Sequence, residues 1–353
     1  MRRRRAACGT IIETAEGAIV RAFVISGPGK AEVVEVDDPV AAPGEVVVDV
    51  ERAGVCGTDM EFYSGDMAYL ATGEAGYPLR IGHEWSGVVA SVGAGVDPGW
   101  IGVRVTGDTM LGCGHCARCT SGRQHLCADR YEIGIRRGRP GALAARLPVP
   151  EKALKVLPAT VDATLGALVE PGGNALRAVR AAEARAGTPI LIMGPGTIGL
   201  LAAMFAAARG ATVHLLGAAP ASLEFARSLG FANVWTRETL PSVPFDAIVD
   251  ATNAAELPGF AVERVEPGGR VVCIGIAGEP ATIDTRRLVL ADITVVGILS
   301  ASPGLSETIE LYASGAVDPR PLVAETVGLD DAADVLSGAR RGIAPKVHID
   351  PRR

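Results

Sequence analysis

The sequence predicts an α/β protein that combines a β-rich, barrel-like unit with a doubly wound parallel sheet. Short runs of alternating apolar and polar residues in the first part of the chain indicate the β-rich unit. A regular succession of strand and helix patterns from residue 190 onward, opened by a glycine loop, indicates the parallel sheet. The length of 353 residues suits two such units, each with its own core.

The β-rich unit begins after Arg21 with strand patterns that are separated by turn residues such as Pro43-Gly44. An alanine-rich helical stretch follows at 163–186, and a last strand at 346–349 is expected to return to this unit. We therefore assign residues 21–170 and 300–353 to it. Its first strand patterns cover residues 22–25, 31–36, 45–50, 85–92 and 101–106.

The second unit, residues 171–299, alternates buried strands with amphipathic helices. This alternation implies right-handed βαβ connections, because a parallel neighbour can be reached only by a crossover. The expected helices cover residues 198–209 and 221–229. The expected strands cover residues 190–193, 212–216, 233–236, 247–250, 270–274 and 294–298.

Composition and charge exclude several classes of protein. The net charge of −6 argues against nucleic-acid binding, which needs a basic stripe. No stretch reaches the roughly 18 apolar residues of a membrane span. Glu13 and Glu16 interrupt what would be the apolar region of a secretory signal. Four of the seven cysteines lie close together, which is typical of metal binding rather than of a disulfide framework. We infer a cytoplasmic, reducing setting.

The clustered cysteines have the spacing C-x₂-C-x₂-C-x₇-C. Four thiolates complete the tetrahedral shell of a zinc ion and leave no open position, so this zinc would stabilise a loop rather than catalyse a reaction. An iron–sulfur ligand set of the ferredoxin type would have a shorter last gap followed by proline. We therefore predict a structural zinc bound by Cys113, Cys116, Cys119 and Cys127.

A second group of potential metal ligands is scattered along the chain. Cys56 stands in Gly-Val-Cys-Gly-Thr-Asp, His83 and Glu84 follow Gly82, and Glu170 precedes Pro171. One thiolate, one imidazole and one or two carboxylates suit a catalytic zinc with an open fourth position. Each residue alone is a weak signal, and the combination beside a four-cysteine lobe is far more specific.

In these motifs the sequence resembles the zinc-containing medium-chain dehydrogenase/reductase superfamily, from Arg21 to the C-terminus. The segments at Cys56, His83 and Glu170 are similar to its polyol, threonine and aminocyclitol dehydrogenase branch. The resemblance implies a GroES-like catalytic unit, with a zinc lobe at 107–130, and a Rossmann unit. Alcohol dehydrogenase relatives with two cysteine ligands and one histidine ligand carry a cysteine where Glu170 stands.

The resemblance also implies a role for each matching residue. Cys56 and His83 would bind the catalytic zinc, and Glu84 and Glu170 would share the remaining protein position, the order between them staying open. Thr58 would pass the proton of the substrate hydroxyl toward the coenzyme ribose and solvent, because an alcohol must lose a proton when it gives up hydride.

The glycine loop Gly194-Pro-Gly196-Thr-Ile-Gly199 lies between an expected strand and an expected helix, the context that a dinucleotide fingerprint requires. The first glycine makes the turn, the second admits the pyrophosphate, and the third lets helix and strand pack. Thr197 and Ile198 complete the loop, whose helix-terminal N–H groups would bind the pyrophosphate.

The position that distinguishes NAD from NADP is Gly217, at the end of the strand 212–216. NAD-dependent enzymes present a carboxylate there to the ribose hydroxyls. Because Gly217 offers none, we favour NADP(H), with NAD(H) as the alternative. Relatives that use NADP usually also show a serine and an arginine just after the glycine. These are absent, and Ser222 or Arg237 would have to substitute.

The function expected from these features is hydride transfer between a nicotinamide coenzyme and a secondary alcohol of polyol, sugar or cyclitol type. A threonine-type 3-hydroxy amino acid dehydrogenase and a non-catalytic binding protein of the same fold are the alternatives. Two zinc ions per chain and a homodimer or homotetramer follow from the resemblance.

One further expectation concerns residues 1–20, which we assign to an N-terminal extension. Family members begin with a methionine where this chain has Val20, and a valine codon can serve as a bacterial start. The hypothesis is that translation begins at Val20.

Overall fold

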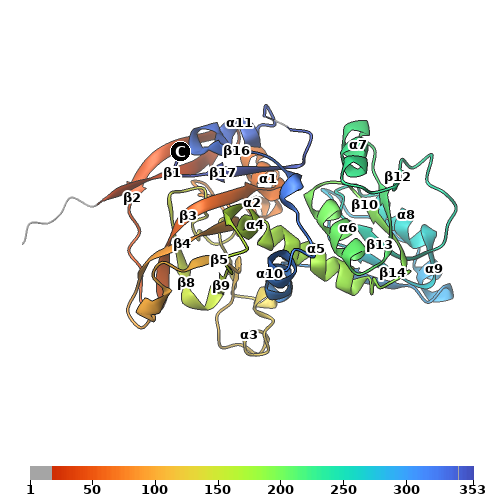
Figure 1. The fold of residues 1–353 in the computed structure, drawn as a ribbon, viewed down its shortest axis with the longest axis horizontal. Helices are drawn as coiled ribbons and strands as arrows, with labels where there is room; N and C mark the ends of the chain where they lie inside the picture. The colour runs from red at the N-terminus through yellow and green to blue at the C-terminus, as the bar shows by residue number, and fades with distance from the viewer. Residues whose placement is uncertain (1–17, 341) are drawn as a thin grey trace, which may run out of the picture.

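The computed structural model describes residues 18–340 and 342–353. Figure 1 shows two halves side by side, with α5 (Val169–Ala181) and α10 (Leu305–Ala313) between them. Antiparallel strands dominate one half, and strands alternate with helices in the other, as expected. Most of the proposed N-terminal extension lies outside the described residues; of its last residues, Ile19 and Val20 belong to strand β1.

The first half is built on a seven-stranded sheet in the order β16-β17-β3-β4-β5-β9, with β8 also paired to β3. The C-terminal strand β17 pairs with β3, so the end of the chain returns to this half as predicted. A separate hairpin, β1–β2, packs against it. The strands are β1 (Ile19–Gly27), β2 (Lys30–Asp37), β3 (Glu45–Val55), β4 (Glu84–Val92), β5 (Arg104–Gly107), β8 (Arg146–Pro150), β9 (Leu154–Val156), β16 (Val323–Gly328) and β17 (Lys346–Asp350).

The second half is a six-stranded, wholly parallel sheet in the order β12-β11-β10-β13-β14-β15. Strand order reverses between β10 and β13, and ligands of doubly wound sheets bind at the carboxyl end of such a reversal. The strands are β10 (Pro189–Met193), β11 (Thr212–Leu216), β12 (Asn233–Trp235), β13 (Phe245–Asp250), β14 (Val265–Cys273) and β15 (Thr294–Gly297). The helices are α6 (Thr197–Ala208), α7 (Pro220–Ser228), α8 (Leu257–Arg264) and α9 (Thr285–Leu290).

Two expected elements differ in the structure. The strand expected at 101–106 begins only at Arg104, because Gly102 takes a left-handed turn with φ of 83°. The helix expected at 163–186 is divided into α4 (Ala163–Ala167) and α5. Pro171 explains the division, because it has no N–H to donate to the carbonyl four residues earlier and is tolerated only in a first helical turn.

The cysteine lobe projects from the first half near α3 (Ala117–Thr120), at the bottom of Figure 1. Its stem is the strand pair β6 (Met110–Leu111) and β7 (Tyr131–Glu132). Short helices α1 (Gly57–Ser64), α2 (Ala68–Ala71) and α11 (Ala332–Leu336) complete the first half.

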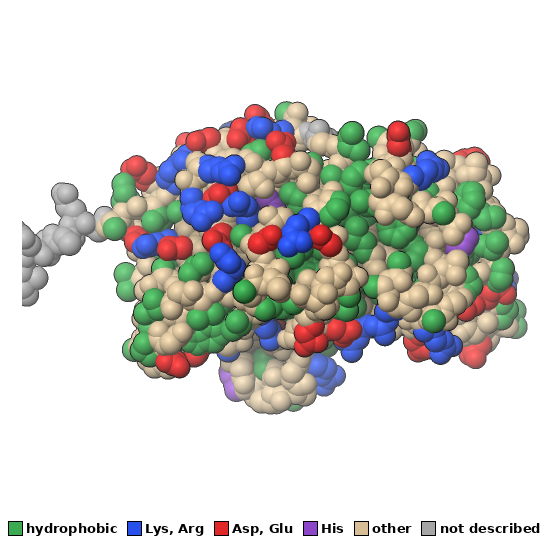
Figure 2. Space-filling view, viewed as in Figure 1, with side chains coloured by type: hydrophobic (Ala, Val, Ile, Leu, Met, Phe, Trp, Pro, Cys, Tyr) green, Lys and Arg blue, Asp and Glu red, His purple; other side chains and the backbone are tan. Residues whose placement is uncertain are grey.

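The surface agrees with the charge pattern of the sequence. Figure 2 shows acidic and basic side chains interspersed on this face of the molecule, without a stripe of one sign. Among the helices of the described residues, none has both the length and the apolar character needed to cross a membrane.

Candidate functional site

The first candidate site forms where β3 ends and β4 begins. Cys56 follows the last residue of β3 and is the N-cap of α1, and His83 directly precedes β4. Gly54 pairs with Glu84 across these antiparallel strands, which brings the two segments together. The Sγ atom of Cys56 consequently lies 3.1 Å from Nε2 of His83. Thiolate and imidazole converge from segments that are far apart in the sequence.

Asp59, in the first turn of α1, contacts both Cys56 and His83. Its fully buried carboxylate accepts hydrogen bonds from the backbone N–H of Cys56 (2.9 Å) and of Gly82 (3.3 Å). Its Oδ1 lies 3.5 Å from Nδ1 of His83, on the side of the ring that faces away from Cys56. Carboxylates in this position orient histidines that bind a metal. Burial alone would raise the pKa of Asp59, but His83, the backbone N–H of Cys56 and the charge of Lys346 together outweigh it and lower the pKa.

Glu170 reaches the same place from α5, which lies between the two halves of the molecule. It lies in the first turn of α5 and is buried, and one of its oxygens accepts a hydrogen bond from Nδ2 of Asn174 at 2.9 Å. Ligand atoms of His83, Glu84 and Glu170 all lie within 4.8 Å of one another. Burial, with a smaller contribution from the neighbouring Glu84, raises the pKa of Glu170 to about 7. The donor set of thiolate, imidazole and carboxylate fits zinc.

Glu84 has a partner that the sequence analysis missed. Its carboxylate accepts hydrogen bonds of 2.9 and 2.7 Å from Nζ of Lys346, which also donates to the carbonyl of Val55 at 2.8 Å. Both side chains of the pair are almost fully buried. The signal in the sequence was weak, because Lys346 is the first residue of the predicted strand 346–349, where a lysine can equally lie at an exposed end. Lysine is almost never buried unless it is paired.

Thr58 lies in the first turn of α1, two residues after Cys56, and is half-buried. Of the candidate ligands, Cys56 contacts His83, and Glu84 and Glu170 lie close to the same histidine, while Thr58 follows Cys56 by two residues in the chain. The aromatic residues nearest in sequence, Phe62 and Trp85, are fully buried and belong to the core.

The four cysteines of the lobe form a compact cluster. Their Sγ atoms all lie within 4.8 Å of one another, with Cys113 and Cys119 at 3.9 Å and Cys116 and Cys127 at 3.8 Å. All four are free thiols in the structure. A tetrahedral zinc site of four thiolates needs such a convergence.

The glycine loop has the geometry that a dinucleotide requires. Gly194 turns with φ of 89°, and Gly196 is the N-cap of α6. A Cβ atom on Gly199 would lie 1.9 Å from the carbonyl oxygen of Gly194, so helix and strand can pack only because this residue has no side chain. A Cβ on Gly196, by contrast, would meet no described atom within 4 Å. The absence of a side chain at Gly196 thus leaves free space at the N-terminus of α6, whose first two residues are Thr197 and Ile198.

Gly217 follows the last residue of β11, and Pro195 of the glycine loop lies next to it. A Cβ atom there would lie 2.7 Å from Cγ of Pro195 and 2.9 Å from Cδ2 of Leu223. The ring of Pro195 therefore occupies the space that a carboxylate at this position would need. Ser222, half-buried in α7, follows shortly after it.

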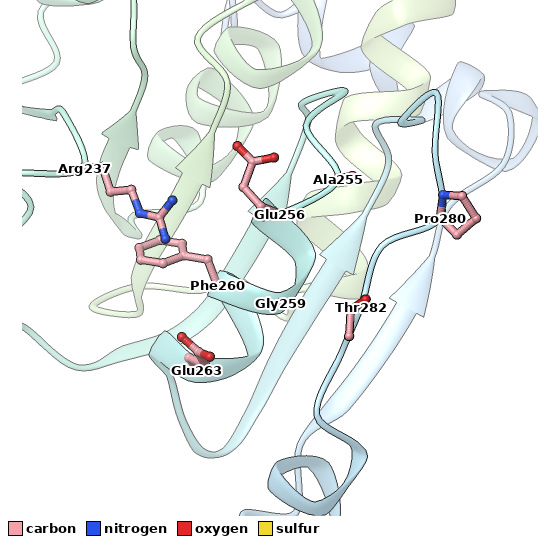
Figure 3. A pocket seen from close by; sticks show the side chains of 8 residues that line it. All are labelled: Arg237, Ala255, Glu256, Gly259, Phe260, Glu263, Pro280 and Thr282. Atoms are coloured by element: carbon pink, nitrogen blue, oxygen red, sulfur yellow. The ribbon is translucent and has the colours of Figure 1, made fainter.

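Arg237 follows the strand that neighbours Gly217, but its side chain lies against α8. The N–H of Gly217 donates to the carbonyl of Trp235, two residues before Arg237. The guanidinium of Arg237 lies 4.8 Å from the ring centroid of Phe260 on α8. Figure 3 shows it at one side of a pocket of about 470 Å³, which Glu256, Glu263 and Thr282 also line. The pocket contains no residue of the glycine loop.

Comparisons with known proteins agree with these features. Residues 42–159 match the family model "Alcohol dehydrogenase GroES-like domain", and residues 197–314 match "Zinc-binding dehydrogenase". The chain is 30% identical to L-threonine 3-dehydrogenase of Saccharopolyspora erythraea over 347 residues, which cover 94% of this chain and 99% of that protein. It is 28% identical to the enzyme of the same name from Rhizobium johnstonii, covering 88% and 92%.

Solved structures agree as well. A zinc-binding dehydrogenase from Sinorhizobium meliloti, bound to NADP, is 28% identical and superposes with a TM-score of 0.86, covering 95% of this chain and all of that one. The 2R,3R-butanediol dehydrogenase from Bacillus subtilis is 26% identical with a TM-score of 0.83, covering 94% and 99%. The chain therefore belongs to the zinc-containing medium-chain dehydrogenase/reductase superfamily and is an oxidoreductase with a GroES-like unit and a Rossmann unit.

Proposed function

We propose that this protein transfers hydride between a secondary alcohol and a nicotinamide coenzyme, with a catalytic zinc at Cys56, His83 and Glu170. The observation that carries the proposal is that Cys56 and Glu170, from separate elements, both approach His83: Sγ of Cys56 lies 3.1 Å from its Nε2, and a carboxylate oxygen of Glu170 lies within 4.8 Å of a ring nitrogen. A lone buried cysteine or histidine is usually a core residue. A thiolate, an imidazole and a carboxylate whose ligand atoms meet are a metal site with an open position.

Between the two glutamates, the contacts favour Glu170 as the direct ligand. Both oxygens of Glu84 already accept hydrogen bonds from Lys346. Glu170 accepts a side-chain hydrogen bond from Asn174 on Oε1 alone, which leaves its second oxygen available. Asp59 fixes the orientation of His83, and Glu84 with Lys346 forms a neutral buried pair behind the ligands.

When bound there, zinc supplies the Lewis acid that lowers the pKa of an alcohol. The chain must provide the exit for the proton, and the Thr58 hydroxyl beside Cys56 suits this role. Thr58→Val removes the hydroxyl with little change in shape. We expect its kcat to fall by about 100-fold, in line with general acid–base contributions, while both zinc ions are retained. A kcat close to that of the wild type would exclude this role.

NADP(H) is the coenzyme we propose, with NAD(H) as the alternative. Two observations support it: Pro195 fills the space that an acidic side chain at Gly217 would need, and Gly217 is hydrogen-bonded to Trp235, two residues before Arg237. We propose that the Arg237 side chain leaves Phe260 and turns toward a 2′-phosphate when NADP(H) binds. The NADP-bound relative from Sinorhizobium meliloti is consistent with this choice.

Steady-state kinetics with each coenzyme test the proposal. We expect Arg237→Ala to raise the KM for NADP⁺ and to leave the KM for NAD⁺ unchanged. Arg286→Ala, in which a well-exposed arginine of α9 is removed, is the matched control. A strong preference of the wild-type protein for NAD⁺ would overturn the assignment.

For the substrate we propose a secondary alcohol of polyol, sugar or cyclitol type. A threonine-type substrate is the second candidate, because L-threonine 3-dehydrogenases are among the similar proteins. Butanediol and galactitol-1-phosphate dehydrogenases are among the similar structures. A panel of polyols, cyclitols and L-threonine, with both coenzymes and with zinc content measured, separates the candidates. The absence of turnover with every alcohol in a protein that holds two zinc ions would favour the non-catalytic alternative.

We further propose that two copies associate through β15, in a reducing, cytoplasmic setting. β15 is the edge strand of the parallel sheet, so the described residues leave one row of its backbone groups unpaired. Exposed apolar side chains occur in the segments next to it in the chain and next to its neighbour β14, namely Val289 and Leu290 of α9 and Ile276. A two-fold axis would pair β15 with itself in antiparallel fashion and cover this surface. Val295→Pro should yield a monomer in analytical ultracentrifugation, whereas a wild-type monomer would refute the proposal.

A further inference from the structure

Asp108 lies at the base of the cysteine lobe and contacts the segment that leaves the parallel sheet, and no candidate catalytic role explains it. It lies two residues before β6 of the stem and is 5% exposed. Its Oδ2 accepts a hydrogen bond of 2.8 Å from the side chain of Gln124, inside the lobe. Its Oδ1 accepts hydrogen bonds from the backbone N–H of Met110 (3.0 Å) and from the hydroxyl of Ser302 (2.7 Å). One buried carboxylate therefore joins segments almost 200 residues apart.

Ser302 belongs to the segment 298–304, which leads from β15 of the parallel sheet to α10. The segment is held in an unusual conformation, because Ser300 is buried and has φ of 73°, a left-handed value that serine rarely adopts. The Ser300 hydroxyl lies 2.8 Å from that of Ser302 and accepts a hydrogen bond from its N–H at 3.1 Å. Such a conformation persists only when the surroundings hold it in place.

The same segment also packs on the helix that carries Glu170. Arg177 of α5 donates to the carbonyls of Leu299 and Ser300. A Cβ on Gly173 of α5 would lie 2.9 Å from Cβ of Ala301, so the two backbones are in close contact. Segment 298–304 is thus fixed on one side by α5 and on the other by Asp108.

We propose that Asp108 is a positioning residue that locks segment 298–304 and thereby sets how the coenzyme-binding half meets the metal-site half. Gln124 connects Asp108 to the cysteine lobe. A change in the conformation of the lobe would therefore change coenzyme binding through Asp108 and segment 298–304. The inference rests on the proposed function, because it needs a coenzyme at the carboxyl edge of the parallel sheet.

The experiment compares Asp108→Ala, Asp108→Asn and Ser302→Ala with the wild-type holoenzyme. The dissociation constants of NADPH and NADH are measured by coenzyme fluorescence, together with zinc content and with hydrogen exchange of peptides that cover 298–304. Hydrogen bonds to a carboxylate correspond to about tenfold or more in an equilibrium constant. We expect Asp108→Ala and Ser302→Ala to weaken coenzyme binding at least about fivefold and to speed exchange in 298–304, with both zinc ions retained.

Two variants separate this role from a general loss of stability. Asp108→Asn keeps an oxygen for Ser302 and Met110, and its amide N–H can donate to the side-chain oxygen of Gln124 once that amide turns over, so this variant should bind coenzyme as the wild type does. Asp97→Ala removes an exposed carboxylate that only caps a turn through the N–H of Gly99, and it should leave coenzyme binding unchanged. If Asp108→Ala fails to fold, Ser302→Ala decides, because it removes one hydroxyl.

The contribution of the lobe is tested by Gln124→Ala. We expect this variant to weaken coenzyme binding, and Gln124→Ala combined with Ser302→Ala to bind no more weakly than Ser302→Ala alone. The inference would be overturned if Ser302→Ala showed the hydrogen exchange in 298–304 and the coenzyme affinity of the wild type. It would also be overturned if Asp108→Asn bound coenzyme as weakly as Asp108→Ala. A wild-type protein that binds neither coenzyme would refute the proposed function instead. Hydrogen exchange in 298–304 would then still test whether Asp108 and Ser302 hold this segment in place.

Discussion

Replacing Lys346 by methionine should destabilise the protein far more than a typical lysine substitution. Lys346 and Glu84 are 1% and 3% exposed in their side chains, and all three protons of the ammonium group are used, two by Glu84 and one by the carbonyl of Val55. Methionine fills a similar volume and removes only the charge and the donors. The Glu84 carboxylate would then remain buried without its counter-ion.

The expected magnitude follows from this burial. Breaking a buried pair by removing one partner costs about 3–5 kcal/mol, because an uncompensated charge is left in a medium of low dielectric constant. Replacing both partners removes that charge, so Glu84→Gln combined with Lys346→Met should regain at least half of the loss. Lys30→Met, at the exposed start of β2, should change stability by less than about 0.5 kcal/mol and serves as the control.

Urea unfolding followed by tryptophan fluorescence provides the measurement, since Trp85 is adjacent to Glu84 and fully buried. A loss below about 1 kcal/mol in Lys346→Met would refute the importance of the pair. A double variant that is as unstable as Lys346→Met would show that the lone charge is not the cause.

Further predictions concern the metal sites and the glycine loop. Burial raises the pKa of Glu170 to about 7, so in the metal-free protein its protonated form stabilises the fold below the ordinary value of 4.5, and this contribution is lost as the pH rises through 7. Zinc competes with the proton, and metal titrations at pH 6 and 8 should show a steeper gain in affinity with pH for the wild type than for Glu170→Gln. Gly199→Ala should lower the melting temperature of the coenzyme-free protein, because its Cβ would lie 1.9 Å from the Gly194 carbonyl. Gly196→Ala should melt like the wild type but bind coenzyme more weakly, and equal effects of the two variants would contradict the roles assigned to them. Cys119→Ser should lose one of two zinc ions in a colorimetric metal assay; retention of both would exclude the four-thiolate site.

Much of the candidate site could be predicted from the sequence, because its chemistry is local. Thiolates separated by two residues converge through the turn that contains them, so the spacing of Cys113, Cys116 and Cys119 already indicates a metal. Gly194 and Gly199 could likewise be recognised, since a glycine loop between a strand and a helix has one common use. Periodicity also placed β11 at its observed bounds.

Other features depend on contacts between distant segments, which no local pattern contains. Lys346 meets Glu84 only because β17 pairs with β3 and thereby comes beside β4. The preference between Glu84 and Glu170 rests on that contact, since an oxygen engaged by an ammonium group is a poor candidate for a metal. The division of the helix at Pro171, by contrast, has a local cause, because proline has no N–H to donate within a helix.

The sequence by itself therefore determined the fold class, the two units and the residue types that can bind zinc and a dinucleotide, because these follow from periodicity and from spacing over a few residues. Only the tertiary structure decided which charges are paired, why Gly217 has no room for an acid, and how Asp108 joins the lobe to segment 298–304. Hydrogen bonds and ion pairs act over about 3 Å, and chain folding alone brings residues hundreds of positions apart within that distance.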